Sequence, residues 1–443
     1  MFDLVVLNGT VASGGDMMPC HVAVKDGRVA ALLEPSAKPE AARTIDASGH
    51  IVLPGLVDAH VHFRDPGLTH KEDFASGSRA AALGGVTTVM VQPTDNPVTM
   101  TAEQFIAKKE SAEGRCAVDF ALQAAVGPDT SHITALAEAG AASFEIFLGL
   151  LPDPVRIVCN ETLVSAMMAV REVDGLVGAT PYDDELAAAA ARGAAGLSDD
   201  WARFTASLPP TIEAAGIARA VLSHRLVGGR MHIRQVSTAL GLMALSMAEG
   251  DVTAEVTPHN LSLTEDMLLR IGAVAKVIPP LREDSDVAAM QAALREGLVD
   301  IVATDHAPHT REEKAAGKSD LGKAPGGFPG VQTMLPVLLK LVGDGVIDYP
   351  DLVRVACEAP ASIFRLSDRK GTLRPGADAD LVLIDPGAPM TVRNEDQASK
   401  AGQTPFNGMA VPATPVLTML RGEVIAERGK IVGNPRGRFL APA

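Results

Sequence analysis

Short runs of apolar and β-branched residues recur along the chain, but their spacing differs between the ends and the middle. Near the amino terminus, residues 2–13, 21–34 and 43–54 are typical of short strands, with N-G and D-G pairs as turn signals. Similar runs return in residues 379–386 and 414–433. Because short strands at two distant ends most economically share one sheet, we expect a small β domain that the middle of the chain interrupts.

The middle of the chain alternates short apolar runs with helical stretches. Residues 71–83 and 286–298 are typical of helices, and the alanine-rich residues 185–196 are also helical in composition. Alternating strands and helices indicate parallel β/α units. Eight such strands predict an α/β fold of the (β/α)₈ TIM-type barrel class. The strand-like runs are residues 51–60, 85–93, 118–127, 141–149, 175–181, 230–238, 252–258 and 299–308.

These patterns predict three segments. Residues 1–50 form the N-terminal part of a composite β-sandwich, residues 51–365 form the barrel, and residues 366–443 form the C-terminal part of the sandwich. Chemistry in such barrels sits at the carboxyl ends of the strands. Several polar residues fall at these ends, namely His60, His62, Glu145, Gln235, His259 and Asp305.

Two histidines follow the first of these strands. His60 and His62 are two residues apart, and Arg64 and Asp65 come directly after them. Side chains at i and i+2 of a strand point the same way, so both imidazoles can share one metal ion. Two solvated loop histidines are the alternative interpretation of this stretch alone.

Composition and charge narrow the class of partner. The chain of 443 residues is 47% hydrophobic, 3% aromatic and 21% charged, with a formal net charge of −15. Such acidity disfavours nucleic acid and anionic membranes, which require clustered Lys and Arg, and favours a small-molecule substrate. Its 4 cysteines are scattered, and no signal peptide or membrane span is recognised. We expect a cytoplasmic protein.

Longer motifs make the chain resemble a known family. "GLVDAHVHFRDPG", "EVTPHNLSLTEDM", "IVATDHAPHT" and "GTLRPGADADLVLIDP" are similar to segments of the amidohydrolase superfamily, and specifically of the class I dihydroorotases. The similarity extends over residues 2–440, and it implies the barrel with a composite β-sandwich. The activity that it implies is opening of a cyclic amide by a metal-activated hydroxide, as in the interconversion of dihydroorotate and N-carbamoyl-aspartate in pyrimidine metabolism.

The resemblance also implies a metal centre. His60, His62 and Asp305 match the ligands of the family's first metal, and Asp305 also matches the general base. Where the bridging lysine often lies, this chain has Glu145, which is either a direct metal ligand or the ion-pair partner of a cation such as Arg234. Thr180 and Gln235 replace the two histidines of the second metal. We therefore expect one metal ion per chain, zinc or another divalent ion.

The substrate contacts implied by the resemblance are partly retained. Arg64 and His309 match residues that hold the substrate carboxylate, and Thr94, with Asn96 two residues on, stands near the family's asparagine. Arg64 has an alternative role as the ion-pair partner of Asp65. Ile278 replaces an asparagine that contacts the substrate ring, which indicates a substrate other than dihydroorotate, or none.

Three functions remain open on this reasoning. The leading prediction is a metal-dependent cyclic amidohydrolase that opens a ring amide, imide or ureide bearing a carboxylate. The alternatives are an allantoinase- or dihydropyrimidinase-type hydrolase and a noncatalytic dihydroorotase-like protein that supports a partner enzyme. We expect the chain to form a homo-oligomer.

Overall fold

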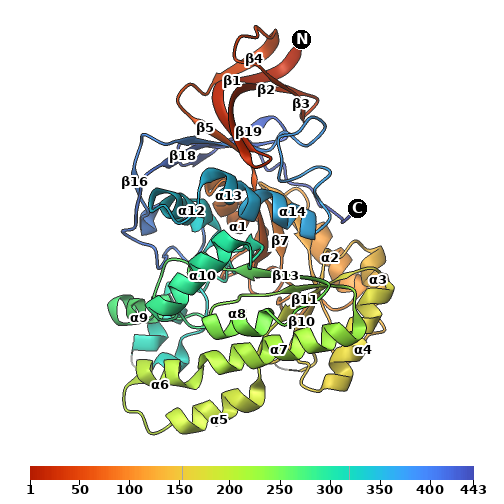
Figure 1. The fold of residues 1–443 in the computed structure, drawn as a ribbon, viewed down its shortest axis with the longest axis vertical. Helices are drawn as coiled ribbons and strands as arrows, with labels where there is room; N and C mark the ends of the chain where they lie inside the picture. The colour runs from red at the N-terminus through yellow and green to blue at the C-terminus, as the bar shows by residue number, and fades with distance from the viewer. Residues whose placement is uncertain (152, 319) are drawn as a thin grey trace.

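The two ends of the chain meet in one sheet, as their strand patterns predicted. The structure is a computed structural model that describes residues 1–151, 153–318 and 320–443. In the sheet of nine strands, the order β20-β19-β18-β15-β5-β1-β2-β3 places strands of both ends side by side, with β4 paired to β1 (Figure 1). The N-terminal strands are β1 (Phe2–Ser13), β2 (Asp16–Lys25), β3 (Arg28–Leu33), β4 (Ala41–Asp46) and β5 (Ile51–Pro54). The C-terminal strands are β15 (Leu381–Asp385), β18 (Thr414–Leu420), β19 (Glu423–Glu427) and β20 (Lys430–Ile431).

Strand β5 joins the two halves of this sheet. It pairs in parallel with β1 and in antiparallel with β15. Val52 and Leu53 are fully buried there. Residues 51–54 therefore belong to the sheet of the chain ends, and the change to the next sheet occurs at Gly55 rather than between residues 50 and 51.

The N-G pair of β1 is a bulge and not the turn that its sequence suggested. Asn8 has a φ of 62°, and the pairing of β1 with β2 shifts register between Val6 and Gly9. A Cβ atom on Gly9 would lie 2.5 Å from Cγ2 of Val52. Because the chain continues through the bulge, the second half of β1 can pair with β5. A two-residue hairpin at this point would not allow that pairing. The D-G pair, Asp26 and Gly27, does connect β2 to β3.

The middle of the chain forms parallel strands separated by helices. A three-stranded sheet has the order β6-β7-β8, and a six-stranded sheet has the order β14-β13-β12-β11-β10-β9. These strands are β6 (Leu56–Val61), β7 (Val86–Val91), β8 (Asp119–Leu122), β9 (Ala124–Ala125), β10 (Phe144–Phe147), β11 (Leu176–Thr180), β12 (Arg230–Ile233), β13 (Asp251–Val256) and β14 (Ile301–Val302). A parallel bridge between Val61 and His306 connects the end of β6 to the segment after β14.

Helices follow most of these strands and run beside them (Figure 1). They include α1 (Phe74–Leu83), α2 (Ala102–Ala112), α3 (Ile133–Glu138), α4 (Asn160–Glu172), α7 (Pro210–Val227), α8 (Ala239–Leu245) and α10 (Asp284–Glu296). Local sequence fixes where they begin: Asp73 accepts a hydrogen bond from the backbone N–H of Ser76, and Thr101 caps α2 in the same way. The predicted helices near residues 71–83, 185–196 and 286–298 are confirmed as α1, α5 (Asp184–Ala194) and α10.

Further short helices lie after β11 and β13 and beyond β14. They are α6 (Asp200–Ser207), α9 (Asp266–Ile271), α11 (Arg311–Ala315), α12 (Met334–Gly343), α13 (Tyr349–Val353) and α14 (Ala359–Ile363). A two-stranded pair, β16 (Met390–Thr391) with β17 (Ala410–Val411), lies in the C-terminal segment. Within the part of the chain that the structure describes, no helix combines the length and apolarity required to cross a bilayer.

A buried lysine ties the sheet of the chain ends to the amino-terminal end of β8. The Nζ atom of Lys370 lies 2.6 Å from Asp119, 3.0 Å from Asp378 and 2.7 Å from Asp380. Burial opposes the charge of Lys370, but the three carboxylates outweigh it and raise its pKa above the ordinary value. The ammonium group therefore occupies a cluster of acids that would otherwise resemble a cation site.

Candidate metal centre

The polar residues at the carboxyl ends of the parallel strands converge on one point. His60 is the penultimate residue of β6, Gln235 follows β12, and Asp305 follows β14. Parallel strands end at the same edge of a barrel-like sheet, so residues far apart in the sequence become neighbours there. Both Gln235 and Asp305 have positive φ angles, 53° and 48°, which are uncommon for residues other than glycine and recur at functional sites.

Three of these side chains offer a compact set of ligand atoms. Nε2 of His60 lies 3.2 Å from Nε2 of His62 and 3.4 Å from Oδ1 of Asp305, and the distance from Nε2 of His62 to that oxygen is 2.9 Å. Ligand atoms of a tetrahedral zinc ion, with bonds of about 2.0–2.1 Å, lie about 3.3–3.4 Å apart. These two imidazoles and one carboxylate therefore have the chemistry and the spacing of a divalent-metal site.

The other nitrogen of each imidazole is held by the protein. Nδ1 of His60 donates to Oε1 of Glu255 at 2.5 Å, and Nδ1 of His62 lies 2.6 Å from the hydroxyl oxygen of Thr94. Such partners fix the orientation of a metal-binding ring and leave Nε2 free for the ion. Thr94, which we had assigned to the substrate, contacts His62 in the structure.

Burial and neighbouring charges set the protonation states of these three groups. Burial lowers the pKa of His62 to about 4, so this ring is neutral at physiological pH. Burial acts in the same direction on His60, but the charges of Glu255 and Asp305 outweigh it and raise the pKa of His60. Burial disfavours ionisation of Asp305, yet the nearby imidazoles hold its pKa below the ordinary value. Asp305 is therefore a carboxylate.

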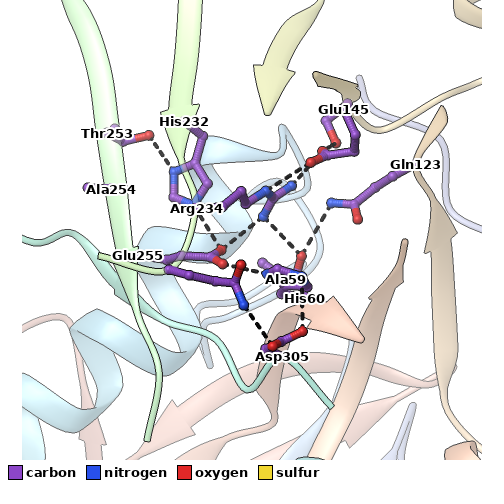
Figure 2. A network of polar contacts seen from close by, with 12 residues as sticks. Ala59, His60, Gln123, Glu145, His232, Arg234, Thr253, Ala254, Glu255 and Asp305 are labelled. Carbon is purple, nitrogen blue, oxygen red and sulfur yellow. Dashed lines mark hydrogen bonds and ion pairs between the residues drawn. The ribbon is translucent and has the colours of Figure 1, made fainter. Parts of the chain in front are cut away.

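Glu145 pairs with Arg234, one of the two contacts that the sequence left open for it. Its Oε1 is 2.6 Å from Nη2 of Arg234 and also accepts a hydrogen bond from Ser143 at 2.6 Å, while its Oε2 accepts from Nε of Arg234 at 3.1 Å (Figure 2). Despite the cost of burial, Arg234 holds the pKa of Glu145 below its ordinary value. The geometry thus favours the ion-pair interpretation of Glu145 over the metal-ligand interpretation.

The same guanidinium reaches a second carboxylate. Nη1 of Arg234 lies 2.9 Å from Oε2 of Glu255, and that oxygen also lies 3.1 Å from Nε2 of His232 (Figure 2). The side chains of Arg234, Glu145 and Glu255 are fully buried. A continuous polar network therefore extends from Glu145 to His60 beneath the candidate metal centre.

Sequence reasoning missed Glu255, which is the hydrogen-bond partner of a candidate ligand. The available signal was a charged residue inside the buried run "VTAEVTP", because an acid on an interior strand position requires a partner. The Nζ atom of Lys71 lies 3.0 Å from Glu313 and 3.3 Å from Nδ1 of His309. Nothing in the sequence around Lys71 indicated this contact.

Arg64 lies at the same site without the ion pair that we considered for it. Asp65 instead pairs with Arg115 at 2.8 Å. Nε of Arg64 is buried and has no hydrogen-bond partner among the described residues. Burial lowers the pKa of Arg64, and the charges that oppose this effect come from Asp305, Asp95 and Glu313. A guanidinium remains charged even so, and the Nε donor of this one is not used by the described residues.

The other two predicted substrate contacts differ in their surroundings. His309 is buried, its Nε2 lies 3.1 Å from the carbonyl oxygen of Gly326, and burial lowers its pKa to about 3. Asn96 is exposed, and its backbone N–H donates to the carbonyl of Pro66 at 3.2 Å. Their roles toward a substrate remain predictions.

A small apolar pocket adjoins Gln235. The space in it that a water molecule can occupy is about 20 Å³. It is lined by Leu150, Thr180, Pro181, Tyr182, Leu208, Pro209, Ile212, Glu213, Gln235, Ile278, Pro279, Pro280 and Arg282. Two positions where the resemblance would place metal-binding histidines, Thr180 and Gln235, thus face mainly aliphatic side chains.

The comparisons with known proteins all indicate the same family. Residues 49–240 match the model described as "Dihydro-orotase-like", and residues 213–425 match the model of the amidohydrolase family. An L-hydantoinase of Paenarthrobacter aurescens is 35% identical over 441 residues, which are 98% of this chain and 96% of that protein. A dihydroorotase of Mycobacterium tuberculosis is 37% identical over 426 residues, covering 93% and 95% of the two chains.

Further relatives carry other activities on similar rings. An allantoinase of Rubrobacter xylanophilus is 36% identical over 453 residues, covering 100% of this chain and 98% of its own. The solved structure of the L-hydantoinase from Arthrobacter aurescens superposes with a TM-score of 0.96 at 34% identity, over 100% of both chains. All three named activities open a cyclic amide by hydrolysis. The chain therefore belongs to the amidohydrolase family and is a hydrolase that acts on the C–N bonds of cyclic amides.

Proposed function

We propose that the chain binds one divalent ion, zinc in the first instance, through Nε2 of His60, Nε2 of His62 and Oδ1 of Asp305. The observation that carries this proposal is the mutual spacing of these three atoms, 2.9–3.4 Å, which suits one face of a tetrahedral site. A divalent ion in such a site supplies Lewis acidity and makes water a stronger acid near neutral pH.

Asp305 is the proposed general base. Water forms a bond to the ring carbonyl carbon, its proton passes to the Asp305 carboxylate, and the C–N bond breaks as that proton is returned to the leaving nitrogen. Asp305 suits this role because its lowered pKa keeps it ionised before the reaction. Gln235 donates to Oδ2 of Asp305 at 2.7 Å and so restricts the carboxylate's rotation.

The environment of Arg64 supports the proposal that the substrate carries a carboxylate, as dihydroorotate and N-carbamoyl-aspartate do. The buried, unpartnered Nε atom indicates donor capacity that the described residues do not use. A guanidinium binds a carboxylate through two parallel hydrogen bonds. His309, Thr94 and Asn96 remain candidates for further substrate contacts, although Thr94 must then serve both His62 and the ligand.

A neutral cyclic ureide of the hydantoin type is the second candidate. Ile278 and the other aliphatic side chains beside Gln235 favour a ring with an apolar substituent, which they must move apart to admit, over one that presents only polar edges. An L-hydantoinase is among the similar proteins at 35% identity. The two candidates differ in whether Arg64 has an anionic group to bind.

One experiment separates these functions. Protein purified without chelators is analysed for metal and then assayed in both directions on dihydroorotate, hydantoins with and without an apolar 5-substituent, and allantoin. About one equivalent of metal together with ring opening supports the proposal, and the preferred ring distinguishes its two forms. Protein that neither contains nor takes up zinc is instead the noncatalytic relative.

Three remaining features belong to the same proposal. We propose that the strands from β6 to β14, with β8 and β9 counted as one strand, act as one closed eight-stranded barrel, supported by the Val61–His306 bridge between the two parallel sheets. We propose that the sheet of the chain ends is a composite sandwich domain, supported by the pairing of β5 with β15. A cytoplasmic homo-oligomer that acts on a small molecule is the assembly we propose.

A further inference from the structure

Two consecutive residues at the end of β12 both point toward the candidate metal centre. Arg234 lies beside it, between Glu145 and Glu255, and its side chain is fully buried (Figure 2). Gln235 adopts a φ of 53°, and its Nε2 lies 2.7 Å from Oδ2 of Asp305. Neighbouring residues of a regular strand would point to opposite faces, so the left-handed conformation of Gln235 brings both side chains to one site.

Arg234 contacts two buried acids at once. Its guanidinium contacts Glu145 through Nη2 and Nε, at 2.6 and 3.1 Å, and Glu255 through Nη1, at 2.9 Å. Two carboxylates without a cation are strongly unfavourable in a dry interior. A cation is therefore required at this position, and here a side chain provides it.

The side chain of Glu145 lies against β11, the strand that pairs with its own strand β10. It lies opposite Gly178 in the parallel register of β10 and β11, and a Cβ atom on Gly178 would lie 2.2 Å from Oε1 of Glu145. The space left by this glycine lets the carboxylate lie flat against β11 and face Arg234. Any larger residue at position 178 would displace it.

We propose that Arg234 and Gln235 are positioning residues that restrict this centre to one metal ion. Arg234 supplies the positive charge that a second ion would bring to Glu145, and Gln235 occupies the oxygen of Asp305 that a second ion would attract. This inference rests on the proposed single-metal site and adds the reason why no second ion binds. It assigns the restriction to Arg234 as well as to the absence of histidines at positions 180 and 235.

The charge of Arg234 is what makes the restriction strong. A second divalent ion near Glu145 would lie close to a guanidinium that is always protonated, and like charges repel most strongly where water is excluded. Restoring histidines alone would add two neutral ligands without removing this repulsion. The two changes can therefore be separated by substitution.

The test measures metal stoichiometry. Substituting Arg234 would not change this quantity if the role of Arg234 were purely structural. The double variant Thr180→His/Gln235→His and the triple variant with Arg234→Met added are dialysed against cobalt(II) or zinc, and bound metal is counted by elemental analysis. We expect about one equivalent in the wild type and the double variant, and about two in the triple variant, where Glu145 becomes available as a ligand. Cobalt absorption spectra report the coordination of the added ion.

A matched triple variant controls for the loss of packing. Arg234→Lys in the same double background keeps a positive charge, and it should return the stoichiometry to about one. Two equivalents in the double variant would overturn the proposal, and this variant retains the whole Arg234 network, so it tests the idea even if the Arg234→Met protein fails to fold. A folded Arg234→Met triple variant that still binds one equivalent would also overturn it. A wild type that takes up no metal would instead refute the proposed function.

Discussion

Glu255 accepts a hydrogen bond from Nδ1 of His60 at 2.5 Å, and Nε2 of the same ring lies 3.2 Å from Nε2 of His62. The acid thus fixes which nitrogen of His60 faces the candidate metal centre. It does so from β13, a strand that contributes no ligand of its own. The same carboxylate binds Arg234 and His232, so its position is set by three partners.

Substituting Glu255 should weaken metal binding without removing any ligand. Glu255→Gln loses the charge that orients His60, and partners of metal-bound histidines typically contribute about 10–100-fold in affinity. We expect a loss of that size in zinc affinity, measured by competition with a chromophoric chelator. Glu283→Gln, at an exposed position, should leave the affinity unchanged. Equal affinity in Glu255→Gln and the wild type would contradict the assigned role.

Removing a ligand should have a larger effect. His60→Ala and Asp305→Asn each leave two of the three protein ligands, and a site with so few ligands does not retain its ion through dialysis. We expect loss of bound metal and of ring-opening activity, with near-normal circular dichroism. The measurement is elemental analysis beside an activity assay. Full metal content in both variants would place the metal elsewhere.

Arg64 should distinguish the two candidate substrate classes. Its Nε atom has no partner among the described residues, so Arg64→Met breaks no ion pair and should fold. A charge-assisted hydrogen bond contributes about 1.5–3 kcal/mol, which corresponds to roughly a ten- to hundredfold rise in KM for a carboxylate-bearing substrate.

Arg115→Met provides the matched control because it breaks the pair with Asp65 instead. It should lower stability and leave KM nearly unchanged. An unchanged KM for the carboxylate-bearing ring in Arg64→Met would move the assignment to the neutral hydantoin type.

The lowered pKa of His259 predicts how the stability of the metal-free protein depends on pH. Burial lowers its pKa to about 4, whereas an unfolded histidine titrates at about 6.5. Between these values the unfolded chain binds a proton that the folded chain does not, so stability falls as the pH decreases through this window. His259→Asn should therefore reduce the loss of unfolding free energy between pH 7 and 5 by about 2 kcal/mol.

Urea unfolding at the two pH values checks this prediction. His132→Asn is the control, because that imidazole is half-exposed, whereas His259 is buried. An identical pH dependence in His259→Asn and the wild type would show that the ring is already charged in the folded protein.

Lys370 should be among the most costly charges to remove. Lys370→Met leaves the carboxylates of Asp119, Asp378 and Asp380 without their shared ammonium group. Breaking a buried ion pair from one side costs about 3–5 kcal/mol. Chemical denaturation should show a loss of that size, against less than about 1 kcal/mol for Lys25→Met at the exposed pair with Asp3. Similar losses for the two variants would contradict the assigned role of Lys370.

The sequence predicted the parts of this molecule that depend on local pattern. Alternating strands and helices predicted the parallel sheets, and the spacing of His60 and His62 predicted that their side chains share one face. The contacts of Glu145 were left open because a strand pattern gives the side to which a residue points and not the partner that it meets there. Its partner Arg234 comes from a strand two places along the sheet.

The remaining differences also come from tertiary contacts. The N-G pair at residue 8 became a bulge because β5 packs against the second half of β1. Arg115, which pairs with Asp65, lies after helix α2 and far from that residue in the sequence. Thr94 binds His62 because β6 and β7 are adjacent strands, a relationship that the pattern indicated, although the motif suggested a substrate contact.

The partners of Asp119 have a consequence for the synthesis of the chain. Its carboxylate is bound by Lys370 and by the backbone N–H of Arg438, residues that follow it by 251 and 319 positions. A ribosome therefore delivers β8 long before the groups that neutralise it, and the base of the parallel sheets stays electrostatically incomplete until residues 370 and 438 have been synthesised. A chain arrested before residue 370 should therefore depend on chaperones to remain in solution.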